Sequence, residues 1–101
     1  MRCRSCAPIP EEVRQLAGLL ERRSSISVIW ASSQGVRRFN EFAQALRPVA
    51  PGTLTARLTE LEEAGILARV LVDDRPPRVE YRLTKRGERV AAAVALLADL
   101  S

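Results

Sequence analysis

The chain lacks histidine entirely, and it lacks other features that catalytic sites are built from. Histidine is a frequent general base and metal ligand, so its absence removes a Ser/His relay and a histidine metal site. The sequence also has no glycine-rich phosphate loop and no pair of carboxylates in an apolar setting. We therefore predict that the protein is not an enzyme and holds neither a cofactor nor a metal.

Long apolar runs are missing as well. No segment approaches the roughly 20 consecutive apolar residues that a membrane helix needs, and the N-terminus lacks the apolar core of a signal peptide. We expect a cytoplasmic protein without a membrane partner. Its 101 residues predict one domain, and burial in a dimer would add to a core of modest size.

Basic residues are plentiful, but lysine is scarce. Sixteen basic and twelve acidic residues give a net charge of +4 and a pI near 10.0, and Lys85 is the single lysine. This balance favours a polyanionic partner, nucleic acid before an anionic membrane. The guanidinium group of arginine can form two hydrogen bonds to one phosphate, although the base composition of the genome explains the arginine excess equally well.

The N-terminal third combines a tail, an amphipathic helix and an apolar segment. Residues 1–10 hold prolines and both cysteines, which predicts a flexible tail ahead of one domain at 11–101. A helix is predicted from Glu11 to about Arg23, because its apolar residues recur every three or four positions. Residues 26–30, which Ser24 or Ser25 could cap, are apolar except for Ser27 and are predicted to be buried, as a helix or a strand.

Two short helices separated by a turn follow. Asn40 is the predicted N-cap of the first, which Arg47 and Pro48 close. Pro51 opens the second, at 51–64, whose core stripe is Leu54, Leu58 and Leu61. At about 100° per residue, the opposite side carries Gly52, Thr53, Ala56, Thr59, Glu60 and Glu63, with Thr55 and Arg57 on the flanks.

A hairpin and a last helix complete the pattern. A strand at 69–72 precedes a partner in which Val79, Tyr81 and Leu83 alternate with outward Arg78, Glu80 and Arg82. The proline-rich turn at 73–77 would form a stiff tip. Thr84 caps a helix whose first turn holds Lys85 and Arg86, where positive charge opposes the helix dipole and is better explained by an anionic partner. The order predicts a mainly helical α+β fold, a winged helix-turn-helix.

Three blocks of sequence, at 36–42, 54–66 and 76–87, resemble the HxlR-type regulators of the MarR-like winged-helix group; the string Pro-Pro-Arg-Val-Glu-Tyr-Arg-Leu-Thr is the most specific. The resemblance implies a homodimeric regulator, which we expect to be a repressor, on a pseudo-palindromic operator of double-stranded DNA. Helix 51–64 and the wing at 73–78 would contact DNA. The implied DNA-binding residues are Arg37, Arg38, Asn40, Gly52, Thr53, Thr55, Ala56, Arg57, Arg75, Arg78 and Lys85; the implied dimerisation residues are Val13, Leu16, Leu20, Val90, Val94 and Leu97.

The chain departs from the family pattern at three places. Residues 21–24 replace a Gly-Gly-Lys-Trp-like string, Ala50-Pro51-Gly52 replaces Ser-Pro-Arg, and Ala56 replaces a polar residue. Alanine can touch a thymine methyl but makes no hydrogen bond to a base, so we expect weak sequence discrimination and more dependence on phosphates and DNA shape. The alternative function is a dimeric winged-helix adaptor that binds proteins without sequence-specific DNA binding.

Cys3 and Cys6 leave three interpretations open: inert thiols, a Cys-x-x-Cys redox pair, or half of a zinc site shared across a dimer. Relatives that sense oxidants use a cysteine just before the first helix, a position that aligns near Glu11 here. A redox or small-molecule effector therefore stays open.

Overall fold

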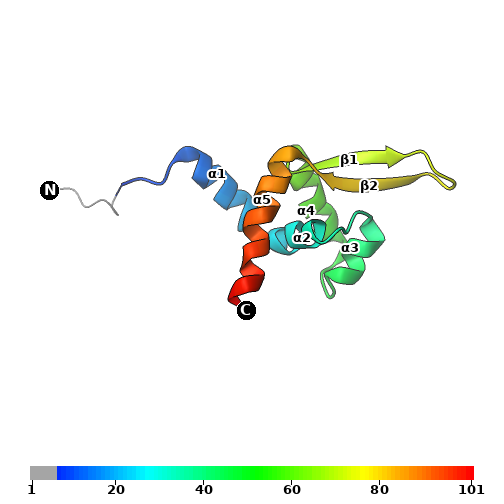
Figure 1. The fold of residues 1–101 in the computed structure, drawn as a ribbon, viewed down its shortest axis with the longest axis horizontal. Helices are drawn as coiled ribbons and strands as arrows, with labels where there is room; N and C mark the ends of the chain where they lie inside the picture. Colours follow the sequence, from blue (N-terminus) through cyan, green and yellow to red (C-terminus); the bar gives the residue numbers. More distant parts are fainter. Residues whose placement is uncertain (1–6) are drawn as a thin grey trace.

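The computed structural model describes residues 7–101 and has the order of elements expected for a winged helix-turn-helix (Figure 1). The elements are α1 (Glu11–Leu20), α2 (Ser25–Ser33), α3 (Phe39–Ala45), α4 (Pro51–Glu63), β1 (Leu67–Val72), β2 (Arg78–Leu83), α5 (Lys85–Ala95) and a 3-10 turn, η2 (Leu96–Leu100). The two strands pair antiparallel in a register that runs from Leu67 opposite Leu83 to Val72 opposite Arg78. This confirms the predicted fold class.

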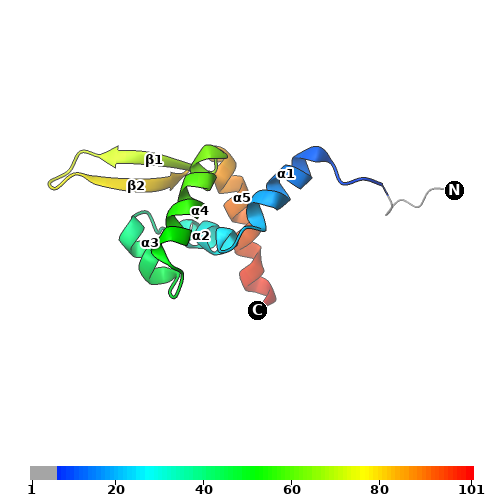
Figure 2. The same ribbon diagram turned by 180° about the vertical axis from the view of Figure 1, so that it is seen from behind.

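The core lies where α2, α4, α5 and the base of the hairpin meet. Leu54, Leu58 and Leu61 are almost fully buried, which confirms the stripe predicted for the second helix of the pair. Phe42 from α3 and Ile66 just before β1 complete the contact with α4. Both views place α2 between α5 on one side and α3 on the other, so α2 is the central helix (Figures 1 and 2).

The apolar segment at 26–30 is part of helix α2, and the prediction that all of it is buried is wrong. Val28 and Ile29 are fully buried, whereas Ile26 and Trp30 are 40% and 42% exposed. Residues four apart share one face of a helix, so Ile26 and Trp30 point away from the core that Val28 and Ile29 enter. Ser24 occupies the N-cap position with a left-handed φ of 71°, but its side chain makes no capping hydrogen bond.

Two predicted helix boundaries need correction. Helix α1 ends at Leu20, three residues before Arg23. Helix α3 begins at Phe39 with Arg38 as the N-cap, so Asn40 lies inside the first turn. The reason is the Glu41 carboxylate, which accepts hydrogen bonds from the backbone N–H groups of Arg37 at 3.2 Å and Arg38 at 3.1 Å and so caps the helix from its third position.

The hairpin projects from the helical body as the wing, at the opposite end of the molecule from α1 (Figure 1). Its base is anchored at Tyr81, whose backbone N–H donates to the carbonyl of Arg37 at 2.7 Å. The Tyr81 ring meets Phe42 edge to face, with 6.5 Å between centroids. This aromatic pair fixes the wing relative to α3.

Candidate nucleic-acid interface

Helix α4 presents an open face on the side opposite its core stripe. Gly52, Thr55 and Thr59 are exposed, while Thr53 and Ala56 are half-buried. The three leucines on the other side hold the helix in the core, and Pro51 at the first position supplies a φ already suited to a helix. The face is therefore fixed in orientation and open to a partner. We call α4 the recognition helix.

Among the uncharged side chains of this face, only the threonine hydroxyls can form hydrogen bonds. The Thr55 hydroxyl donates to the carbonyl of Pro51 at 2.9 Å, one turn back, so its proton is already used. The Thr55 oxygen can still accept a hydrogen bond, and its methyl group is free to touch a thymine methyl. Gly52 and Ala56 have no polar side-chain atom. The chemistry of the face agrees with the prediction of weak base discrimination, which stays a prediction.

The predicted phosphate contacts differ in availability. Arg38, Arg75 and Lys85 are exposed and make no ion pair within residues 7–101. Arg37, in contrast, is half-buried, and its Nη1 donates to the carbonyls of Ser32 at 2.9 Å and Val36 at 3.0 Å. Ser32 lies in the last turn of α2 and Val36 follows its end, so Arg37 caps that helix. Its guanidinium is already engaged in the fold.

Ion pairs stiffen the wing. Arg78 pairs with Asp74 and, at 3.0 Å, with Glu80, which also pairs with Arg82 at 2.9 Å. The Glu80 side chain, predicted to point outward with Arg78 and Arg82, is paired with both and is only 12% exposed. Hydrogen bonds from Arg78 and Arg82 hold the pKa of Glu80 below its ordinary value. Arg78 is thus engaged within the wing, whereas Arg75 at the tip is free of any ion pair in the described chain.

Two further arginines make hydrogen bonds within the fold. Arg57 is only 13% exposed and pairs with Glu60 at 3.1 Å. Arg86 donates to the carbonyl of Ala64 at 2.9 Å and so caps the C-terminal end of α4. This contact explains Arg86 without an anionic partner, contrary to the prediction made for Lys85 and Arg86 together. Lys85 is exposed.

Three glutamates that the sequence did not single out have pKa values below the ordinary 4.5. Backbone hydrogen bonds from Arg37 and Arg38 lower the pKa of Glu41, and the Arg22 side chain lowers that of Glu60. A carboxylate with a lowered folded pKa stabilises the fold most above the unfolded pKa, near 4.5, and this contribution is lost as the pH falls through the folded value.

We therefore expect the urea midpoint to be nearly constant from about pH 6 to about pH 8, where these glutamates are ionised in both the folded and the unfolded state. The midpoint should fall as the solution is acidified below about pH 4.5, the unfolded pKa. Glu41→Gln removes one proton-linked group, so its midpoint should fall less steeply with acid. The control is Glu63→Gln, on an exposed residue without an ion pair in the described chain, which should keep the wild-type slope. An equal acid slope in Glu41→Gln and wild type would contradict the assignment.

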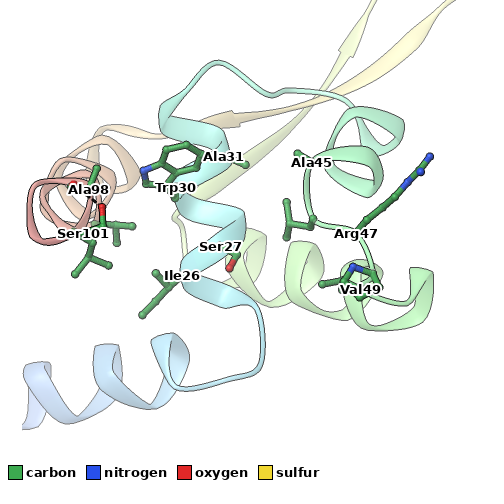
Figure 3. Close-up of a pocket in the computed structure, with 13 residues that line it drawn as sticks. Ile26, Ser27, Trp30, Ala31, Ala45, Arg47, Val49, Ala98 and Ser101 are labelled. Atoms are coloured by element: carbon green, nitrogen blue, oxygen red, sulfur yellow. Dashed lines mark hydrogen bonds between the residues drawn. The ribbon is translucent and has the colours of Figure 1, made fainter.

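Two apolar grooves lie on the helical body. One, with a volume of about 660 Å³, crosses α2 between Ile26 and Trp30 on one side and the α3–α4 turn on the other (Figure 3). The second, about 540 Å³, lies between α1 and α5 and is lined by Leu16, Leu20 and Val90 among others. Val94 and Leu97 line both grooves, so the apolar surface is continuous around α5.

Five of the six predicted dimerisation residues line these grooves, and Val13 does not. Val13 and Leu97 are exposed, and Leu16, Leu20 and Val90 are half-buried. Val94 is only 6% exposed and belongs to the core, because α5 packs against α2. Within residues 7–101, no cluster of three metal-ligating side chains occurs and no helix is long and apolar enough to span a membrane. Cys3 and Cys6 lie outside the described residues.

Similarity to known proteins agrees with this geometry. The HxlR-like helix-turn-helix family model matches residues 19–101. The HTH-type transcriptional regulator sll1512 of Synechocystis is 38% identical over 78 residues, which are 77% of this chain and 58% of the relative. The HTH-type regulator YtfH of Escherichia coli is 34% identical over 85% of this chain and 68% of its own.

A solved structure shows the same fold. The reduced form of the transcriptional regulator YodB from Bacillus subtilis superposes with a TM-score of 0.81 at 25% identity, covering 91% of this chain and 90% of YodB. The relatives are regulators of transcription and not enzymes, and the chain spans little more than half of sll1512. The chain belongs to the HxlR-like helix-turn-helix family of transcriptional regulators.

Proposed function

We propose that the protein is a homodimeric DNA-binding regulator, a repressor, that binds a pseudo-palindromic operator through the recognition helix and the wing. The observation that carries the proposal is the open face of α4, held by a leucine stripe and accompanied by the exposed cations Arg38 and Arg75. Positive charge supplies affinity for the DNA backbone, and a helix in the major groove supplies register. The DNA contacts we propose are Arg38, Asn40, Gly52, Thr53, Thr55, Ala56, Arg75 and Lys85.

The surface of α1 supports the dimer. This ten-residue helix has no buried residue, although Val13, Leu16 and Leu20 form an apolar stripe on it. An isolated helix of this length is marginally stable in water, so packing against a second surface would stabilise it. The continuous apolar surface around α5 provides area of the same kind, and a two-fold axis would bring both patches together in a self-complementary interface.

A selection of binding sites from random DNA tests the function. We expect the purified dimer to enrich an inverted repeat whose half-sites are about one helical turn, roughly 10 base pairs, apart, because two-fold symmetry sets their spacing. We expect the preference over random DNA to be near the low end of the usual range, roughly a thousandfold, because α4 offers few hydrogen bonds to bases. A folded dimer that enriches no sequence would favour the adaptor function instead.

The wing tip gives a separate prediction. Arg75→Ala should weaken binding to all DNA sequences alike and reduce the slope of log K against log salt by about 0.9, the value for one lost phosphate contact. The control is Arg14→Ala, which removes the same charge from α1 at the far end of the molecule (Figure 1). Titrations with labelled duplexes at several salt concentrations measure both. A loss confined to one operator sequence would argue for a base contact by Arg75.

A further inference from the structure

Glu60 connects two parts of the chain that are distant in sequence. It follows the exposed Thr59 on the recognition helix, and its carboxylate accepts a hydrogen bond at 2.9 Å from Arg22, in the turn between α1 and α2. The same carboxylate pairs at 3.1 Å with Nε of Arg57, one turn earlier on α4. We call Arg22, Arg57 and Glu60 the charge clamp.

Within the charge clamp, Arg57 is turned back toward the protein. Its Nη1 lies 3.4 Å from the carbonyl oxygen of Arg23, to which it donates, and its Nη2 donates to Glu60 at 3.3 Å. Arg57 is the one arginine of α4, and its side chain is only 13% exposed. A guanidinium engaged by a carboxylate and a carbonyl has few donors left for a phosphate.

Attraction to DNA does not explain why a glutamate occupies position 60. A carboxylate beside a face that meets a polyanion lowers affinity by repulsion. Glu62 and Glu63 on the same helix are exposed and have no ion pair within residues 7–101, whereas Glu60 is half-buried between two arginines. The hydrogen bond from Arg22, with the charge of Arg57, keeps the pKa of Glu60 below its ordinary value. The ion pairs therefore persist throughout the neutral range.

We propose that Glu60 is a positioning residue for DNA recognition, which acts through Arg57 by holding that arginine off the DNA backbone. The inference rests on the proposed function, since it takes α4 as the helix that faces DNA. Glu60 thereby limits the binding free energy from phosphate contacts, which is the same for every DNA sequence. For a helix with few groups that distinguish bases, this limit preserves the preference for the operator.

Glu60→Gln is expected to release Arg57 to a phosphate. One added phosphate contact steepens the slope of log K against log salt by about 0.9, so the loss of affinity between 50 mM and 200 mM salt grows by about three- to fourfold. The gain at low salt applies to every sequence, so the ratio of operator to random-DNA affinity falls. Glu63→Gln removes the same charge from the same helix without touching the charge clamp, and its slope should stay at the wild-type value.

Substitution of Arg57 in both backgrounds tests the mechanism. We use Arg57→Met, which keeps much of the apolar stem, and Arg57→Gln as a second variant, and we confirm folding by thermal melting. In the wild-type background the salt slope should not change, because Arg57 does not contact DNA. In the Glu60→Gln background the same substitution should remove the added slope of about 0.9.

Each alternative has its own outcome in titrations of random and selected duplexes. A flatter slope for Arg57→Met alone would overturn the proposal by making Arg57 a direct contact. Equal slopes for Glu60→Gln and Glu63→Gln would overturn it in favour of simple charge removal. If the wild-type dimer binds neither duplex at low salt, the proposed function fails, and the role proposed for Glu60 fails with it. If the wild type binds DNA in a salt-dependent way and either of the first two results is found, only the role of Glu60 is rejected.

Discussion

Replacing Gly87 by alanine is expected to destabilise the fold by about 3 kcal/mol, the upper end of what overpacking a core usually costs. Gly87 lies in the first turn of α5 and is buried. A Cβ atom at this position would be 2.0 Å from the carbonyl oxygen of Ile66 and 2.9 Å from its carbonyl carbon. Backbone atoms cannot rotate aside as a flexible side chain does, so α5 itself would have to move.

The contact has a structural purpose. The carbonyl of Ile66 accepts a hydrogen bond from the backbone N–H of Thr84 at 3.1 Å, and the Thr84 hydroxyl caps α5 by accepting from the Gly87 N–H at 3.0 Å. A glycine lets the start of α5 approach the backbone just before β1 this closely. Moving the helix would disturb both hydrogen bonds, so the cost exceeds that of a steric contact alone.

The thermal midpoint measures the effect. For a chain of this size, 3 kcal/mol corresponds to a drop of roughly 12 to 24 °C. Gly18→Ala is the matched control, because nothing lies within 4 Å of a Cβ at that position in α1. There the substitution should raise stability by about 0.5 to 1 kcal/mol, the usual gain of helix propensity. A Gly87→Ala midpoint within a few degrees of wild type would show that α5 can shift freely.

Leu16→Glu is expected to convert the dimer to a monomer. Leu16 lines the groove between α1 and α5, on the stripe that we propose to be covered by a second copy. A charge buried there without a partner is strongly unfavourable. Because a dimer gains from holding two half-sites at once, the affinity for the inverted repeat should fall by about 100-fold or more, while the affinity for a single half-site should not change.

Sedimentation and titrations with full and half operators separate the two effects. Gln15→Glu is the control, since it adds the same charge at the neighbouring, exposed position of α1 and should remain dimeric. If Leu16→Glu also sediments as a dimer at micromolar concentration, the partner surface lies elsewhere. If it is monomeric and yet binds the full repeat as well as wild type does, DNA binding does not depend on the dimer.

The elements with a strong period were predictable from the sequence. The Leu54, Leu58 and Leu61 stripe reflects geometry that the segment carries within itself. The alternation expected in β2 does not show in its burial, since Arg78 and Arg82 both pair with Glu80. Residues 26–30 were harder, because a short, mostly apolar run has no clear period that distinguishes helix from strand. Only the neighbours of α2 decide that Val28 and Ile29 enter the core while Trp30 does not.

The availability of arginines was not predictable in the same way. Arg57 and Glu60 are three residues apart, a spacing that sequence can flag as an ion pair on a helix. Arg22 joins them from 38 residues away, and Arg86 reaches Ala64 from the next helix, contacts that exist only once the chain has folded. Sequence therefore located a basic surface, and the structure distinguishes the cations that hold the fold from those that remain available.

Position 52 has a consequence for how this regulator could change its operators. Gly52 lies in the first turn of the recognition helix, on its exposed face, and nothing lies within 4 Å of where a side chain would begin. A larger residue can therefore be accommodated without repacking, and replacing glycine in a helix favours the folded state. Under the proposed function, mutations at this position would alter operator preference at no cost in stability, so new target sites could be acquired by a single substitution.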